Sequence, residues 1–379
     1  MPYLNIDEVE SALILAGKPP NAAFCQLITL PSLTWEGRQC HAIRLGNGSG
    51  PGRIGVYFLG GVHAREWGSS DILINFIEQV SKAYRTNSSL SLGGKSFSEE
   101  EIHAIINELD IFIFPQANPD GRNFSMTSDA MWRKNRRPAP PGHPNCVGVD
   151  VNRNYDFLWN YPVYFNPAAG VMNYTDPCDY QVYIGPAAGS EPETQNVVWI
   201  MDSNPSIRFF VDLHSYGEDI LYSWGDDEDQ TADPNMNFLN SAYNGIRGIG
   251  EDTAYQEFIK SDDLSLAEAL AQSMATAIQA VRGREYTIES SFSLYPTAGT
   301  SDDYSFSRHF ADTSKGKIIA YTLEWGSPTN ATPFHPPYIE MQNIIQEVTA
   351  GLIQFCIHII SAGVSQALPS WLFLLLEKP

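Results

Sequence analysis

This chain of 379 residues lacks the signatures of several common enzyme and metal-binding classes. No Cys-x-x-Cys pair is present, which excludes zinc ribbons and thioredoxin-type redox chemistry. His-Glu-x-x-His and His-x-x-Glu-His are missing, so the helical zinc-peptidase patterns do not apply. Without Gly-x-Ser-x-Gly or a complete phosphate-binding loop, an α/β-hydrolase nucleophile and a P-loop nucleotide site are also unsupported.

Positive charge is scarce as well. Lys and Arg together number 23 against 44 Asp and Glu, which gives a formal net charge of −21. A surface of this sign repels phosphate backbones and anionic lipid, so we expect neither nucleic-acid nor membrane-surface binding. The apolar run at 371–376, close to the C-terminus, is too short to span a bilayer.

The chain also has few cysteines and no visible leader. Its five cysteines are an odd number, so at least one thiol is left unpaired. The first residues, MPYLNIDEVESAL, are acidic and lack the basic region of a signal peptide. Either the protein is cytosolic or a leader has been removed.

Apolar residues make up 43% of the chain, enough for a large core, and their spacing alternates between two periods. The helical period predicts helices at 6–15, 71–84, 102–109, 191–202, 237–249, 264–281 and 338–360, with Ser69 or Ser70 capping the second. Short apolar runs predict strands at 24–30, 40–45, 54–59, 110–114, 206–213, 220–224 and 318–323. The segment from about 118 to 190 is irregular, and long loops of this kind usually carry function.

Three of the predicted strands end in a polar side chain that can do chemistry: His63, His214 and Glu324. In open α/β sheets, ligands bind outside the carboxyl ends of the strands. Of the eight histidines only His63 has a glutamate three residues later, Glu66. His2Glu is an established zinc ligand set, and His214 is the natural third ligand. The alternative is that His63 is a hydrogen-bonded residue at the rim of the sheet, because short motifs arise freely by chance.

Seven segments, in order along the chain, resemble the zinc carboxypeptidases of the pancreatic A/B type, the M14 peptidases. They are HARE at 63–66, NPDG at 118–121, MWRKNR at 131–136, CVGVDVNRNYD at 146–156, LHSYG at 213–217, YPTAGTSDDYSF at 295–306 and TLEWG at 322–326. The resemblance runs from about residue 3 to about 357. It implies a single α/β domain with a mixed, twisted eight-stranded sheet flanked by helices. We expect residues 1–362 to form this catalytic domain without a prosegment, and 363–379 to form a C-terminal tail.

The resemblance also assigns roles to individual residues. His63, Glu66 and His214 match the ligands of one Zn²⁺ per chain. Glu324 matches the general base, which takes a proton from water and passes it to the leaving amine. Arg133 matches the arginine that stabilises the developing oxyanion.

A second group matches residues that contact substrate. Asn152 and Arg153 correspond to the pair that grips the free C-terminal carboxylate, and Tyr295 to the tyrosine that closes over the bound residue. Further residues of the substrate cleft implied by the matching motifs are Arg65, Ser215 and Tyr216.

Asp302 corresponds to the base of the specificity pocket, where a carboxylate would favour a C-terminal Lys or Arg. The alternative is that Asp302 turns out of the pocket or makes a structural bond, as we expect of its neighbour Asp303. Two departures from the pancreatic pattern point toward microbial or fungal relatives and different secondary contacts. Ala130 stands where the family often has an arginine, and Trp325-Gly326-Ser327 follows the base.

Cys146 resembles a cysteine that bridges to a partner about two dozen residues further on, for which Cys178 is the candidate. A bridge there implies a secreted protein or another oxidising compartment. The alternative is two reduced cysteines in loops.

The predicted function is hydrolysis of the C-terminal peptide bond of peptides and proteins by a monomer. A prosegment or a proteinaceous inhibitor is the other partner that the resemblance suggests. Two rival hypotheses remain: a zinc-binding pseudoenzyme, and an M14 peptidase of cell-wall or γ-linked peptides.

Overall fold

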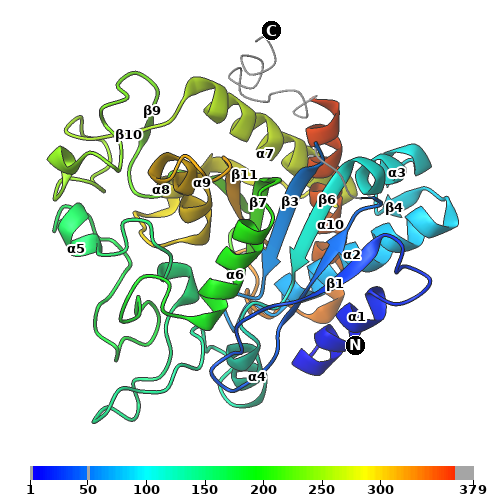
Figure 1. Cartoon of the computed structure of the whole chain (residues 1–379), viewed down its shortest axis with the longest axis horizontal. Coiled ribbons are helices and arrows are strands. Elements are labelled where there is room, and N and C mark those ends of the chain that lie inside the picture. Colours follow the sequence, from blue (N-terminus) through cyan, green and yellow to red (C-terminus); the bar gives the residue numbers. More distant parts are fainter. Residues whose placement is uncertain (1–2, 49–51, 363–379) are drawn as a thin grey trace, which may run out of the picture.

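A mixed sheet of eight strands forms the centre of this computed structural model, which describes residues 3–48 and 52–362 (Figure 1). Its strands are β1 (Cys25–Thr29), β2 (His41–Leu45), β3 (Ile54–Gly60), β6 (Leu109–Phe114), β7 (Ile207–His214), β8 (Asp219–Tyr222), β11 (Thr287–Ser290) and β12 (Ile319–Glu324). They lie in the order β1-β2-β6-β3-β7-β12-β8-β11, and the central strands β6, β3, β7 and β12 run parallel. Two short strand pairs lie apart from this sheet: β4 (Leu90–Leu92) with β5 (Lys95–Phe97), and β9 (Asp229–Gln230) with β10 (Glu257–Phe258). The predicted fold class is confirmed.

Helices cover the sheet, as Figure 1 shows. They are α1 (Ile6–Ala16), α2 (Gly68–Thr86), α3 (Glu99–Glu108), α4 (Pro119–Thr127), α5 (Tyr161–Tyr164), α6 (Pro192–Ser203), α7 (Ser261–Arg282), α8 (Ser291–Leu294), α9 (Ser301–Ala311) and α10 (Tyr338–Ser361), with 3-10 turns η1 (Val151–Arg153) and η2 (Ser241–Tyr243). The helices α2, α3 and α7 all pack against α10, and together with it they form one layer. On that side, Phe355 of α10 contacts an aromatic ring from each of three central strands, Phe58, Phe209 and Tyr321.

The opposite side of the sheet carries the polar side chains. Successive residues of a strand point to opposite faces, so Asp212 and His214 of β7 point away from the α10 layer that Phe209 contacts. Helix α9 packs against β7 and β12, and its first residue, Ser301, bonds to Asp212. The candidate site therefore lies on the α9 side of the sheet.

Helix α10 is long and apolar enough to cross a membrane, with a mean hydropathy of 1.5 in its most apolar window. However, 67% of that window is buried inside the fold, which is typical of the core helix of a globular domain. The predicted tail at 363–379 follows this helix and lies outside the described residues.

Local signals explain where several helices begin. Asn5 caps α1 and Ser98 caps α3, each in a reciprocal capping box with the glutamate three residues later. A cap of this kind contributes about 1 kcal/mol. Helix α2 begins differently, because Ser69 and Ser70 lie inside it and donate instead to backbone carbonyls of β7 and the loop after β6. The predicted serine cap of α2 is therefore wrong.

The predicted helix at 237–249 is also wrong. This segment is a chain of turns, with only η2 at its centre. The side chains of Asn237 and Asn240 accept hydrogen bonds from backbone amides two residues further on, which favours turns over helix. Gly245 and Gly248 then adopt φ of 83° and 86°, a left-handed conformation that ends any helical path.

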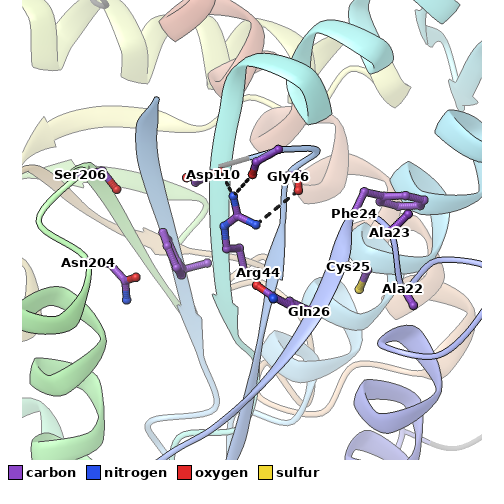
Figure 2. A pocket seen from close by; sticks show the side chains of 12 residues that line it. Ala22, Ala23, Phe24, Cys25, Gln26, Arg44, Gly46, Asp110, Asn204 and Ser206 are labelled. Carbon is purple, nitrogen blue, oxygen red and sulfur yellow. Dashed lines mark hydrogen bonds and ion pairs between the residues drawn. The ribbon is translucent and has the colours of Figure 1, made fainter. Parts of the chain in front are cut away.

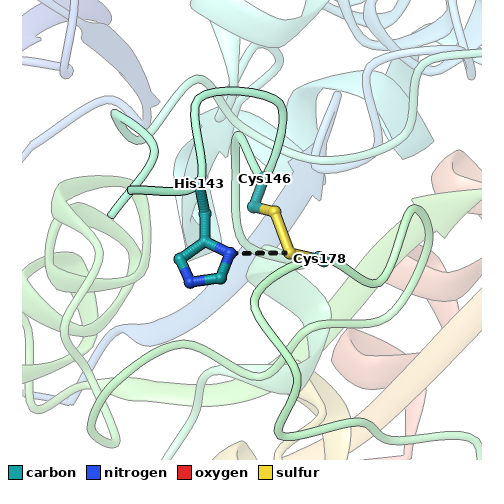
Figure 3. A group of neighbouring side chains, drawn as sticks. All are labelled: His143, Cys146 and Cys178. Carbon is teal, nitrogen blue, oxygen red and sulfur yellow. Dashed lines mark hydrogen bonds between the residues drawn. A yellow bond between two sulfur atoms is a disulfide. The ribbon is translucent and has the colours of Figure 1, made fainter. Parts of the chain in front are cut away.

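The irregular segment between α4 and α6 is cross-linked by a disulfide between Cys146 and Cys178 (Figure 3). The two cysteines are 32 positions apart, and the helical elements described between them are the 3-10 turn η1 and the four-residue helix α5. The predicted pairing is confirmed, and Cys25, Cys40 and Cys356 are free and buried.

Replacing both bridged cysteines by serine should lower the free energy of unfolding by about 3–4 kcal/mol, because a 32-residue loop is no longer closed in the unfolded chain. Urea denaturation followed by tryptophan fluorescence measures the change. Reductant should shift the midpoint of the wild type and leave the double variant unchanged. Equal midpoints for the two proteins under oxidising conditions would contradict the prediction.

Candidate active site

The turn after β3 carries His63 and Glu66, both buried with 4% and 2% of their surface exposed. Its backbone is tied to the loop of Arg133, since the Ala64 amide donates to the Arg133 carbonyl at 2.9 Å. The following Gly68 begins α2, and a Cβ there would lie 2.7 Å from the Trp325 ring. The absence of a side chain at Gly68 therefore lets the turn lie close against the end of β12.

Parallel pairing brings the other two predicted residues to the same edge of the sheet. His214 is the last residue of β7 and Glu324 the last residue of β12, and the two are direct register partners. β3 pairs with β7 on its other side, so the turn bearing His63 follows at the same edge.

Three potential ligand side chains converge there. His63 Nδ1 lies 2.8 Å from Glu66 Oε1 and 3.0 Å from His214 Nδ1, and His214 Nδ1 lies 3.1 Å from Glu66 Oε2. Tetrahedral zinc ligands at about 2.0–2.1 Å from the metal stand about 3.3 Å apart, so this buried His2Glu set needs only a small expansion to hold zinc. The two imidazoles and one carboxylate fit Zn²⁺ in donor type as well.

Each histidine is held from behind by a buried aspartate. His63 Nε2 lies 3.2 Å from Asp150 Oδ1, and His214 Nε2 lies 3.0 Å from Asp212 Oδ2. Both aspartates are fully buried. Carboxylates in this position orient ligating imidazoles and fix their tautomer.

Sequence reasoning did not single out either aspartate. Asp212 stands two residues before His214 on one strand, so the period of two places both side chains on one face and could have revealed it. Asp150 lies in the irregular segment, where no periodicity indicates its direction.

The charges at this edge shift the protonation of its groups. Burial alone would lower the pKa of His214, but the carboxylates of Asp212 and Glu66 outweigh it and raise that pKa well above its usual value. Burial likewise opposes ionisation of Glu66, but the two histidines lower its pKa overall. The metal-free site thus resembles a histidinium–carboxylate cluster.

Glu324 behaves differently from Glu66. Burial, together with repulsion from Glu66, raises the pKa of Glu324 to about 8, although His214 and Arg133 oppose the shift. Its Oε2 is shielded from solvent and has no hydrogen-bond partner among the described residues. This carboxyl group is therefore free to exchange a proton with a bound molecule.

Two arginines border the ligand cluster. Arg133 Nε and Nη2 each lie 2.9 Å from Asp150 Oδ2, the same carboxylate whose other oxygen contacts His63. Arg153 donates to the carbonyl oxygens of Asn152 and Met172 and lies 3.4 Å from Tyr295 Oη. Burial would lower the pKa of Arg133, but Asp150 reverses the shift, so this guanidinium stays charged.

Asn152 lies between these groups. Its Oδ1 accepts from the Ser301 amide at 2.8 Å, and its Nδ2 lies 3.5 Å from His214 Nε2. Asn152 and Arg153 form the turn η1 beside the ligands, where Asp150 caps the turn.

The remaining predicted cleft residues lie in the loops that follow β3 and β7. Arg65 stacks over Phe334, with its guanidinium carbon 4.3 Å from the ring centroid, and donates to Gln181. Tyr216 is 39% exposed and meets Phe334 edge-on at 4.9 Å, while the Ser215 amide donates to Glu66 Oε2 at 3.2 Å. Their contacts with substrate stay predictions.

Asp302 and Asp303 occupy the first turn of α9, and both are buried. Asp302 Oδ2 accepts from Ser291 Oγ at 2.8 Å. Asp303 accepts from the Gly225 amide, and burial together with the charge of Asp302 raises the pKa of Asp303 well above its usual value. Asp303 therefore has the structural bond expected of it.

Two other features of the described residues are not candidates for the site. His143 lies 3.9 Å from Cys178 Sγ, but both cysteine sulfurs are bonded to each other and offer no thiolate to a metal (Figure 3). A cleft of about 470 Å³ is lined by Arg44 and Asp110, which pair at 2.6 Å (Figure 2). It reaches the start of β6 and the loop before β7, at the opposite end of the strands from His214.

Comparison with known proteins agrees with this geometry. Residues 18–351 match the family model described as zinc carboxypeptidase. Carboxypeptidase A4 of Mus musculus is 26% identical over 292 residues, 77% of this chain and 55% of that protein. Metallocarboxypeptidase A of Trichophyton rubrum is 34% identical over 194 residues, 50% of this chain and 40% of that protein. The chain thus spans about half the length of the curated relatives it matches.

Solved structures show the same fold. Carboxypeptidase A from Helicoverpa armigera superposes with a TM-score of 0.70 at 21% identity, covering 97% of this chain and 74% of that chain. Bovine thrombin-activatable fibrinolysis inhibitor was solved in complex with tick carboxypeptidase inhibitor. It superposes with a TM-score of 0.69 at 20% identity, covering 95% of this chain and 98% of that chain. The chain belongs to the zinc carboxypeptidase family, as its sequence motifs predicted.

Zinc affinity should fall as pH falls. Below the raised pKa of His214 the metal-free imidazole holds a proton that zinc must displace, so the association constant should drop about tenfold per pH unit for each proton displaced. Competition with a chelator at several pH values measures this slope. Replacing His214 by alanine should abolish tight binding, whereas His143→Ala should leave it unchanged. A pH-independent affinity would contradict the histidinium–carboxylate assignment.

Proposed function

We propose that this protein is a zinc-dependent exopeptidase that removes the C-terminal residue of peptides and proteins. The observation that carries the proposal is the meeting of His63, Glu66 and His214 with Glu324 at one edge of the sheet. Membership of the zinc carboxypeptidase family supports the same reaction class. A bound zinc ion supplies Lewis-acid polarisation of a carbonyl oxygen and lowers the pKa of water.

Side chains around the ligands are proposed to transfer the proton and to stabilise the developing negative charge. Glu324 takes a proton from the attacking water and returns it to the leaving amine, a task for a carboxyl group that is free of structural bonds. Arg133, kept charged by Asp150, faces the negative charge that develops on the carbonyl oxygen. A zinc ion beside Glu324 would oppose its raised pKa and favour the ionised base at neutral pH.

Selectivity for chain ends is proposed to come from Arg153 and Asn152. A guanidinium binds a carboxylate through a planar pair of hydrogen bonds, and an internal peptide bond has no such group to offer. Tyr295 is proposed to cover the bound terminal residue, and its hydroxyl 3.4 Å from Arg153 supports this role.

For the terminal side chain we propose a preference for Lys or Arg. Asp302 is buried at the start of α9, and a positive side chain would balance its charge. Its bond to Ser291 uses one oxygen and is also compatible with a structural role, in which case selectivity is broad.

We also propose a compartment, an oligomeric state and partners for the protein. The disulfide is consistent with an oxidising compartment, and we propose that the protein is secreted and acts as a monomer. Its partners would be peptides and proteins with a free C-terminus. The tick inhibitor bound to the bovine structural neighbour supports a proteinaceous inhibitor or a prosegment as a further partner.

Replacing Glu324 by glutamine should lower kcat by about 10²–10⁴-fold, because the amide cannot accept the proton of water. Zinc content should stay at one per chain, since Glu324 lies outside the ligand set. Hydrolysis of a C-terminal peptide library and metal analysis measure the two effects. Glu99→Gln, on the exposed first turn of α3, is the matched control. Loss of zinc together with activity would contradict a role confined to proton transfer, and an inactive wild type would favour the pseudoenzyme hypothesis.

Peptides that differ only in their last residue or its carboxyl group test the substrate assignment. We expect Lys and Arg to exceed Phe, Leu and Glu in kcat/KM, and a C-terminal amide to react at least about tenfold more slowly, the loss of one charge-assisted bond. Asp302→Asn should erase the basic preference, while Asp262→Asn on the exposed start of α7 should not. Equal rates for the free acid and the amide would contradict carboxylate binding by Arg153. A preference for Phe would contradict selection of basic residues by Asp302.

A further inference from the structure

The two aspartates behind the histidines lead to different parts of the site. Asp150 joins His63 to Arg133, as described above. Asp212 joins His214 to Ser301, the first residue of α9, whose Oγ donates to Asp212 Oδ2 at 2.6 Å. The next residue of that helix is Asp302.

We propose that Asp212 is a positioning residue that holds the His214 ring with Nδ1 toward the metal and ties this ligand to the first turn of α9. The inference rests on the zinc site of the proposed function. It does not depend on whether the protein hydrolyses peptides.

The strand geometry makes Asp212 suited to this role. It stands two residues before His214 on the central strand β7, on the same face, where the backbone is paired on both sides. The side chain is fully buried, so its position is set by packing and bonding and not by solvent. A rigid element of this kind places a bond more reproducibly than a loop does.

The bond also selects the tautomer of His214. When Asp212 accepts a hydrogen bond from the Nε2–H group, the lone pair of Nδ1 is left free for the metal, and Nδ1 is the atom that approaches His63 and Glu66. Without Asp212, neutral His214 could carry its proton on either ring nitrogen. The tautomer protonated on Nδ1 could not bind the metal through that atom.

This tautomer has a second effect, on Asn152. The Asn152 amide is oriented by the Ser301 amide, which donates to Oδ1, so Nδ2 faces His214 Nε2 at 3.5 Å. A protonated Nε2 cannot accept from Nδ2. The hydrogens of Nδ2 therefore remain available for the carboxylate of a substrate, and Asp212 influences metal and substrate contacts through one proton.

Zinc affinity of purified variants tests the proposal. Asp212→Asn and Asp212→Ala should each weaken Zn²⁺ binding by about 10–100-fold in chelator competition, and shift the visible absorption of the Co²⁺-substituted protein. Ser301→Ala keeps the Asp212–His214 bond, so its Zn²⁺ affinity should fall by about threefold or less. Asp227→Asn is the matched control, because Asp227 is equally buried but bonds to the Gly248 amide away from the ligands.

A measurement on the wild type covers the case in which the Asp212 variants do not fold. Two-bond ¹H–¹⁵N spectra of the zinc-loaded protein, labelled at histidine, should show His214 protonated on Nε2 and ligating through Nδ1. Folded Asp212 variants with wild-type zinc affinity, or a His214 protonated on Nδ1, would overturn the inference. Zinc binding that depends on Asp212 in a protein without peptidase activity would support it while refuting the proposed function.

Discussion

The parallel register of β3, β7 and β12 is the constraint on which the site depends. It aligns the ends of three central strands at one edge of the sheet, so that residues 151 and 110 positions apart in sequence, His63 with His214 and His214 with Glu324, become neighbours. Apolar packing on the other face, centred on Phe355 of α10, holds this register, because a slip of one residue would turn every side chain of β7 over. The chemistry is thus supported by contacts that take no part in it.

Buried charge is arranged in linked pairs and not as isolated ions. Asp150 and Asp212 each accept from more than one group, and each lies against a buried histidine whose ring nitrogen would otherwise lack a partner. Since the same carboxylates fix the direction of the imidazole rings, the bonds that make burial tolerable also orient the ligands.

The sequence predicted the central strands, most helices and the family, because long apolar runs and a family-ordered series of motifs carry strong signals. The structure also brings the three candidate ligands His63, Glu66 and His214 together. It failed where local bonding outweighs periodicity, as in the asparagine-rich turns at 237–249. It also missed α9, whose first turn is polar and is buried through bonds to other elements, from Ser301 to Asp212 of β7 and from Ser291 of α8 to Asp302. Asp150 was missed because loop direction is set by tertiary contacts that no spacing encodes.

The double contact of Asp150 has a consequence for how such a site can change. One carboxylate holds both a candidate metal ligand, His63, and the charged arginine, Arg133. Substitutions at the three positions are therefore expected to be non-additive, since the first loss already disturbs both partners. A substitution at Asp150 would therefore alter the settings of His63 and Arg133 together, and neither contact can be adjusted alone from this position.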